Sequence, residues 1–132
     1  MKHIEEGEQI LLFEFLEKAQ PFIYQMAFAV PNGGYRNPRE AQRMKWAGVK
    51  KGVPDIFIAI PTSEHHGLFI ELKRPIVKGE SKPNITKEQI IWIQNLNEQG
   101  YRAIVCYGFD EALKEIKSHY KIVQKTYNFG SV

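Results

Sequence analysis

The sequence has little cysteine and no long apolar run. Cys106 is the only cysteine among 132 residues, which excludes a disulfide within the chain, and no Cys/His spacing matches a zinc site. No apolar stretch approaches the ~20 residues of a membrane-spanning helix, and the first residues lack the pattern of a secretory signal. We therefore expect no membrane segment and a reducing, cytoplasmic compartment.

Internal repeats and linker-like segments are also missing. Hydrophobic residues make up 43% and charged residues 25% of the chain, as in ordinary globular proteins. A chain of this length can bury a core without disulfides or structural metals. The sequence therefore predicts one domain over residues 1–132.

The hydrophobic periodicity predicts an α/β fold with a mixed sheet flanked by helices. We expect a first helix over about 4–19 and a strand over 25–30, closed by a turn at 31–34. The remaining predicted elements are a helix from 37 to 48, two strands that form a hairpin between 52 and 73, a helix from 86 to 99, a strand over 102–107 and a helix over 109–120.

The predicted hairpin carries charge at one end. Asp55 opens its first strand, and Glu71 and Lys73 close its second. A turn centred near residue 64 places Asp55 opposite roughly residue 72, close to both charges, but the sequence does not fix the register. Two acids beside a lysine indicate a site for a divalent cation such as Mg²⁺. The alternative is a surface ion pair between Lys73 and either acid.

A third acid and a glutamine are further candidates for this site. Glu8 projects into the apolar stripe of the first helix and Glu5 lies at its edge. A carboxylate on a packing face is costly unless it is paired or binds a metal; the alternative is an acid favoured by the helix dipole. Gln89 forms a capping box with Thr86 and also lies on the face expected to pack on the sheet, so it can serve both cap and site.

Basic residues concentrate around this acidic cluster. Residues 36–87 contain eleven Lys/Arg and five acids, an excess that suits a phosphodiester substrate, although a charged face can also serve solubility alone. The helix from 37 to 48 has a thin apolar stripe and suits contact with a phosphate backbone. Trp46 can stack on a base or pack against the domain, and packing is favoured. The DNA-binding candidates are Arg36, Arg39, Arg43, Lys45, Lys50, Lys51 and Arg74.

A known signature runs through these residues. Pro54-Asp55, fifteen residues, and then Glu71-Leu72-Lys73 match the PD-(D/E)xK nuclease motif. The flanking segments, from Glu8-Gln9 to Gly100-Tyr101, are similar to the VRR-NUC (virus-type replication-repair nuclease) family over roughly residues 5–120. The chain resembles the stand-alone phage and bacterial members of that family.

The resemblance implies a restriction-endonuclease-like αβββαβ core with an inserted helix after the first strand. It also implies that Asp55 and Glu71 bind Mg²⁺ or Mn²⁺ with the Leu72 carbonyl, and that Glu8 completes the acidic set, with Glu5 as the open alternative. Lys73 would position the attacking water, supported by Gln89.

The implied activity is hydrolysis of DNA phosphodiester bonds by an endonuclease. Stand-alone members resemble homodimeric Holliday-junction resolvases, and Ile10 and Phe13, on the face of the first helix away from its apolar stripe, are compatible with a homodimer. We therefore expect a structure-specific nuclease for branched DNA in a bacterial or phage-infected cell. The alternatives are a flap, fork or nicking nuclease, or a DNA-binding module without catalysis.

Overall fold

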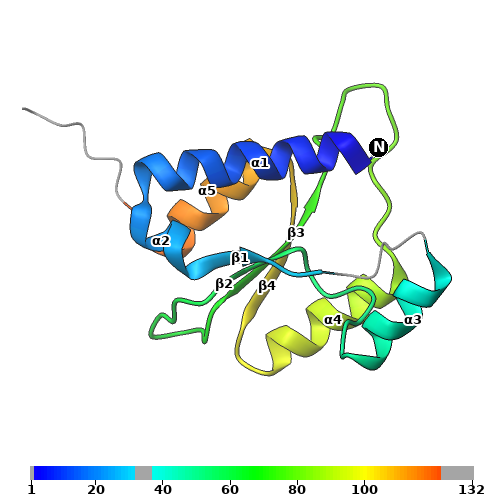
Figure 1. Cartoon of the computed structure of the whole chain (residues 1–132). Helices are drawn as coiled ribbons and strands as arrows, with labels where there is room; N and C mark the ends of the chain where they lie inside the picture. Colours follow the sequence, from blue (N-terminus) through cyan, green and yellow to red (C-terminus); the bar gives the residue numbers. More distant parts are fainter. Residues whose placement is uncertain (1, 32–36, 123–132) are drawn as a thin grey trace, which may run out of the picture.

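A four-stranded mixed sheet separates two layers of helices (Figure 1). The computed structural model describes residues 2–31 and 37–122. Strands lie in the order β1-β2-β3-β4; the first three are antiparallel, and β4 runs parallel to β3. The strands are β1 (Ala27–Ala29), β2 (Ile56–Ile58), β3 (Leu68–Lys73) and β4 (Arg102–Tyr107). The predicted mixed α/β architecture is confirmed.

The helices divide between the two faces of the sheet. In Figure 1, α1 (Lys2–Ala19) and α5 (Phe109–His119) lie on one side, and α4 (Lys87–Glu98) lies on the other with α3 (Pro38–Trp46) beside it. The short α2 (Pro21–Met26) links α1 to β1. None of the described helices combines the length and apolarity that crossing a membrane requires.

The hydrophobic core lies between the sheet and the α1/α5 layer. Leu12 and Leu16 of α1 are fully buried, as is Ile116 of α5. On β3 the core residues alternate along the strand: Leu68, Ile70 and Leu72. The other residues of the strand therefore face the α4 side. Glu71 and Lys73 belong to this second set, and both are nevertheless buried.

Two helix starts form as their sequences predict. The Asn37 side chain accepts hydrogen bonds from the amides of Arg39 at 2.9 Å and Glu40 at 3.4 Å, which caps α3. Thr86 and Gln89 form a complete capping box at the start of α4. These caps satisfy amides that have no partner inside the helix.

The segment before β1 differs from its prediction. Residues 21–26 form a helix, so Gln25 and Met26, predicted to begin the strand, belong to α2 instead; Pro21 not only follows α1 but also occupies the first turn of this new helix. Tyr24 of α2 meets Phe13 edge to face, with ring centroids 6.4 Å apart. Phe13, predicted on an outward face, therefore packs against the core. The predicted turn at 31–34 lies almost wholly outside the described residues.

Candidate active site

Two carboxylates meet where β2 begins and β3 ends. The register pairs Ile56 with Ile70, and one residue further along the hairpin Asp55 lies opposite Glu71. The predicted partner was roughly residue 72. Because side chains alternate between faces, the one-residue difference puts Asp55 and Glu71 on the same side of the sheet. Asp55 Oδ2 also accepts a hydrogen bond from the Leu72 amide at 2.8 Å, which anchors the carboxylate to β3.

Gln89 joins the two charged side chains of β3. Its Nε2 donates to Glu71 Oε2 at 3.1 Å, and its Oε1 accepts from Lys73 Nζ at 3.0 Å. The same Oε1 accepts from the Thr86 amide at 2.9 Å in the capping box. One side chain thus starts α4 and holds both site residues, the double role that the sequence suggests. Lys73 Nζ also lies 3.6 Å from Glu71 Oε2.

Burial changes the protonation of the two carboxyl groups. Glu71 is only 2% exposed. Burial, followed by the nearby Asp55 charge, raises the pKa of Glu71 to about 8. Burial also raises the pKa of Asp55, while its hydrogen bonds from the Leu72 amide and Glu71 work in the opposite direction. Without a cation, Glu71 therefore retains its proton at neutral pH.

The two candidate acids of α1 have different surroundings. Glu8 Oε1 accepts a hydrogen bond from the Phe109 amide at 3.1 Å, at the start of α5. A Cβ on Gly108 would lie 3.0 Å from this oxygen, so the glycine leaves room for the contact. Glu5 Oε2 instead accepts from the Arg74 amide at 3.4 Å, directly after β3, and its charge raises the pKa of Asp55. Glu5 is therefore directed to the end of β3 that carries Glu71 and Lys73.

The predicted basic residues separate into two groups. Those on α3 and the segment after it are exposed to solvent: Arg39, Arg43, Lys45, Lys50 and Lys51. Arg74 is instead engaged by its own loop, where it donates to the Ser81 carbonyl at 2.8 Å and pairs with Glu80 at 3.6 Å. Arg36 lies outside the described residues. The exposed group is thus centred on α3.

The sequence leaves open whether Glu5 or Glu8 is the acid from α1 that reaches the site. Glu5 and Glu8 lie three residues apart, so both fall on one face of α1. Helical spacing alone does not decide which of them reaches the strand ends, since that depends on the position of α1 along the sheet. What the sequence does show is that Glu5 lies about one turn nearer the start of α1 than Glu8 does.

The oxygen atoms at the strand ends fit a hard divalent cation. Glu71 Oε1 is buried and receives no hydrogen bond from the described residues. Asp55 and the Leu72 carbonyl supply further oxygens of the kind that Mg²⁺ prefers. Within the described residues no three His, Cys, Asp or Glu side chains form a metal group by themselves. A cation here would therefore also depend on backbone oxygen, water and substrate, which is common for Mg²⁺.

The raised pKa of Glu71 predicts a pH-dependent stability in the absence of metal. Between pH 4.5 and about 8 the folded protein retains a proton that the unfolded chain has released. The free energy of unfolding therefore falls as the pH rises through this window, and it levels off above it. Glu71→Gln removes this titration.

Urea denaturation in EDTA across this pH range measures the effect. Glu71→Gln should lose less stability than the wild type on going from acid to alkaline pH. Glu14→Gln, at an exposed position on α1, serves as the control and should follow the wild type. Equal pH profiles for Glu71→Gln and wild type would contradict the assignment.

Comparison with known proteins identifies the family. No curated protein matches the chain. The family model described as VRR-NUC domain matches residues 30–110. A solved structure described as a "VRR_NUC domain protein" superposes with a TM-score of 0.75 at 28% identity, covering 90% of this chain and 89% of that one. The chain therefore belongs to the VRR-NUC domain family and has the fold of a PD-(D/E)xK nuclease.

Proposed function

We propose that this nuclease domain is a Mg²⁺- or Mn²⁺-dependent DNA endonuclease that acts on branched DNA. The observation that supports this most strongly is the pair of opposed carboxylates, Asp55 and Glu71, beside a lysine whose position is fixed by Gln89. A surface ion pair does not account for this arrangement, because Lys73 is only 7% exposed. Buried charges of this kind are costly to fold and indicate a functional site.

The cation would be held by Asp55, Glu71 and the Leu72 carbonyl. When bound, it supplies Lewis acidity for the scissile phosphate and lowers the pKa of a coordinated water. Glu71 must release its proton before it can ligate, and so must become a carboxylate as the metal enters. The second carboxylate, Asp55, keeps its orientation through the Leu72 amide.

Lys73 has the position needed to orient the attacking water. Its ammonium group is held by Gln89 Oε1 at 3.0 Å and lies 3.6 Å from Glu71 Oε2. One of its three N–H donors is therefore directed by a hydrogen bond to Gln89 and the charge is paired with Glu71, which leaves N–H groups to donate to a water or phosphate oxygen. In the hydrolysis, the water oxygen forms a bond to phosphorus, the bond from phosphorus to the leaving sugar oxygen breaks, and the proton lost by the water is passed through solvent to the sugar oxygen, which leaves as a hydroxyl group.

Glu5 is the better candidate for the acid from α1. Its carboxylate lies at the end of β3 and acts on Asp55, whereas Glu8 caps α5. We therefore assign Glu5 a role in holding metal-bound water and Glu8 a role in stability.

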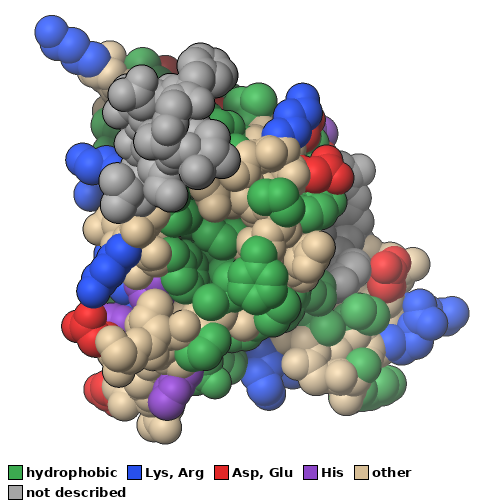
Figure 2. Space-filling view, turned by 90° about the vertical axis from the view of Figure 1, so that its left-hand side faces the viewer, with side chains coloured by type: hydrophobic (Ala, Val, Ile, Leu, Met, Phe, Trp, Pro, Cys, Tyr) green, Lys and Arg blue, Asp and Glu red, His purple; other side chains and the backbone are tan. Residues whose placement is uncertain are grey.

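A homodimer would place two such sites on one branched substrate. β1 is an edge strand of the sheet, and Phe28 on it is 51% exposed. Nearby, Gln9, Ile10, Phe13 and Ala29 line a hollow of about 250 Å³. Figure 2 shows hydrophobic side chains gathered over the middle of the face that bears α2 and β1. Exposed edges and apolar patches of this kind are typical of protein interfaces, and we propose that a second copy covers this one.

Cleavage assays test the proposed activity. Labelled four-way junction, flap, blunt duplex and single-stranded DNA are incubated with wild-type protein in Mg²⁺, Mn²⁺ or EDTA. Branched DNA should be cut with either metal and remain intact in EDTA. Lys73→Ala should lower the rate about 100-fold or more, the usual cost of removing one preorganised hydrogen-bond donor from the reacting centre.

Lys114→Ala on α5 is the control, since Lys114 is exposed on the opposite layer. Cleavage that persists in EDTA, or an unchanged rate in Lys73→Ala, would refute the mechanism. Binding of DNA without cleavage in every metal would support the non-catalytic module instead.

The two acids of α1 are separated by a pair of matched substitutions. Glu5→Gln should reduce the metal-dependent rate and raise the metal concentration needed for half-maximal activity, with little change in stability. Glu8→Gln should lower the free energy of unfolding by about 1 kcal/mol, because a charged cap of α5 is lost. Cleavage kinetics and urea denaturation of both variants measure this. The reverse pattern would restore Glu8 as the site acid.

Light scattering tests the dimer. The wild type should have twice the chain mass of 15.3 kDa at micromolar concentration. Phe28→Arg should shift it to the monomer mass, because a charge cannot be buried in an apolar interface without a large cost. Val77→Arg adds the same charge to an exposed loop position and should remain dimeric. A wild type that is monomeric throughout would exclude the resolvase-like pair.

A further inference from the structure

Trp46 is exposed to an unusual degree. At 77% it has the largest exposed fraction among the large hydrophobic side chains that the structure describes. It ends α3, and none of the side chains of that helix is buried. The packing role favoured by the sequence is therefore wrong. An indole left in solvent on a helix without a buried face requires another explanation.

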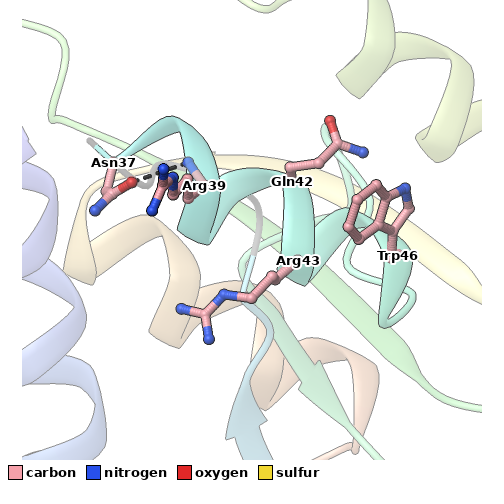
Figure 3. A pocket seen from close by; sticks show the side chains of 5 residues that line it. All are labelled: Asn37, Arg39, Gln42, Arg43 and Trp46. Atoms are coloured by element: carbon pink, nitrogen blue, oxygen red, sulfur yellow. Dashed lines mark hydrogen bonds between the residues drawn. The ribbon is translucent and has the colours of Figure 1, made fainter.

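Trp46 lines two surface hollows, and basic side chains line both of them as well. On one side is a hollow of about 520 Å³, lined by Asn37, Arg39, Gln42, Arg43 and Trp46 (Figure 3). On the other is a hollow of about 670 Å³, lined by Ala41, Met44, Lys45, Trp46, Val49, Lys50 and Lys51. Trp46 belongs to both walls, and none of the described residues that line either hollow is acidic. The indole thus lines two hollows in which every charged lining residue that the structure describes is cationic.

Together, these side chains indicate which kind of ligand the surface around Trp46 can bind. Arginine and lysine side chains bind phosphate, and an exposed indole binds the flat face of a base. The amide of Gln42, in the first hollow, can exchange hydrogen bonds with a base edge. Asn37 is excluded from that role at its Oδ1, which accepts two α3 amides. A nucleotide supplies the anion, the flat apolar face and the polar edge together.

We propose that Trp46 stacks on an unpaired base of the DNA substrate while Arg39 and Arg43 hold adjacent phosphates. This rests on the proposed nuclease function and makes its substrate more specific. In duplex DNA both faces of a base are covered by its neighbours, so only an unpaired nucleotide can present a free face to the indole. The preferred substrate is therefore DNA with a single-stranded segment beside the duplex.

The position of α3 connects this stacking site to the catalytic end of the sheet. In Figure 1, α3 lies beside α4. A Cβ on Gly52, in the segment after α3, would lie 2.6 Å from the Glu88 Cβ and 2.7 Å from its carbonyl carbon. Glu88 directly precedes Gln89, which binds Glu71 and Lys73. The chain that leaves α3 therefore contacts α4 next to a site residue.

The stacking site also distinguishes between branched substrates. A four-way junction with fully paired arms offers no unpaired base, whereas a flap or a splayed fork offers several. Flap and fork DNA are therefore the favoured substrates.

Fluorescence of Trp46 tests the stacking directly. The chain contains two tryptophans, and Trp92→Phe leaves Trp46 as the only one. In EDTA, a single-stranded oligonucleotide and a duplex with an unpaired overhang should quench the Trp46 emission. A blunt-ended hairpin duplex of equal charge should quench it much less. Equal quenching by all three DNAs, or none by any, would overturn the proposal.

Binding by substituted proteins provides an independent measurement in the same buffer. Trp46→Ala should weaken binding of overhang DNA about 10- to 100-fold, as expected for loss of one stacked base, and this loss should exceed that for blunt duplex at least tenfold. Trp46→Phe should recover most of the affinity. Phe22→Ala removes another exposed aromatic ring, on α2 at the opposite end of the molecule (Figure 1), and should change neither affinity.

The failures of the two proposals have different signatures. If Trp46→Ala binds every DNA as the wild type does, the stacking site is refuted, while metal-dependent cleavage by the wild type still supports the nuclease. If the wild type cuts no DNA with any metal, the nuclease proposal fails, and the fluorescence and affinity results in EDTA still decide whether Trp46 binds an unpaired base.

Discussion

The register of β2 on β3 is the constraint on which the site depends. Ile56 and Ile70 are fully buried partners in that register, so hydrophobic packing decides which residues face each other at the strand ends. A slip of one residue would turn Asp55 toward the core and away from Glu71. The apolar side chains that stabilise the fold therefore also bring the two carboxylates together.

On the α4 side of the sheet, the first turn of α4 holds the charged side chains of β3 in place. Gln89 completes the capping box of α4 and at the same time binds Glu71 and Lys73. A glutamine suits this position because its amide has both a donor and an acceptor end. The carboxylate of a glutamate would accept from Lys73 and the Thr86 amide, but it could not donate to Glu71. Secondary structure and chemistry thus constrain the same residue.

Features decided by neighbouring residues were predictable from the sequence, whereas those decided by packing were not. The caps at Asn37 and Thr86 and the hairpin between residues 56 and 73 follow from short-range patterns and are present in the structure. The exact partner of Asp55 depends on the shape of the turn and on the core beneath it. The exposure of Trp46 depends on where a whole helix is attached. The family resemblance supplied the fold, but the choice between Glu5 and Glu8 depends on where α1 lies along the sheet.

Gly52 lies where the chain that leaves the basic helix α3 contacts the rest of the domain. Gly52 has a φ of +91° and no space for a Cβ against Glu88, so this position accepts little besides glycine. The side chains of α3 are not buried, so exchanging them costs little folding free energy. Mutation can therefore change the charge and shape of α3 almost freely while its attachment point stays constant. The surface proposed to bind DNA can therefore change in this domain while the proposed site residues stay the same.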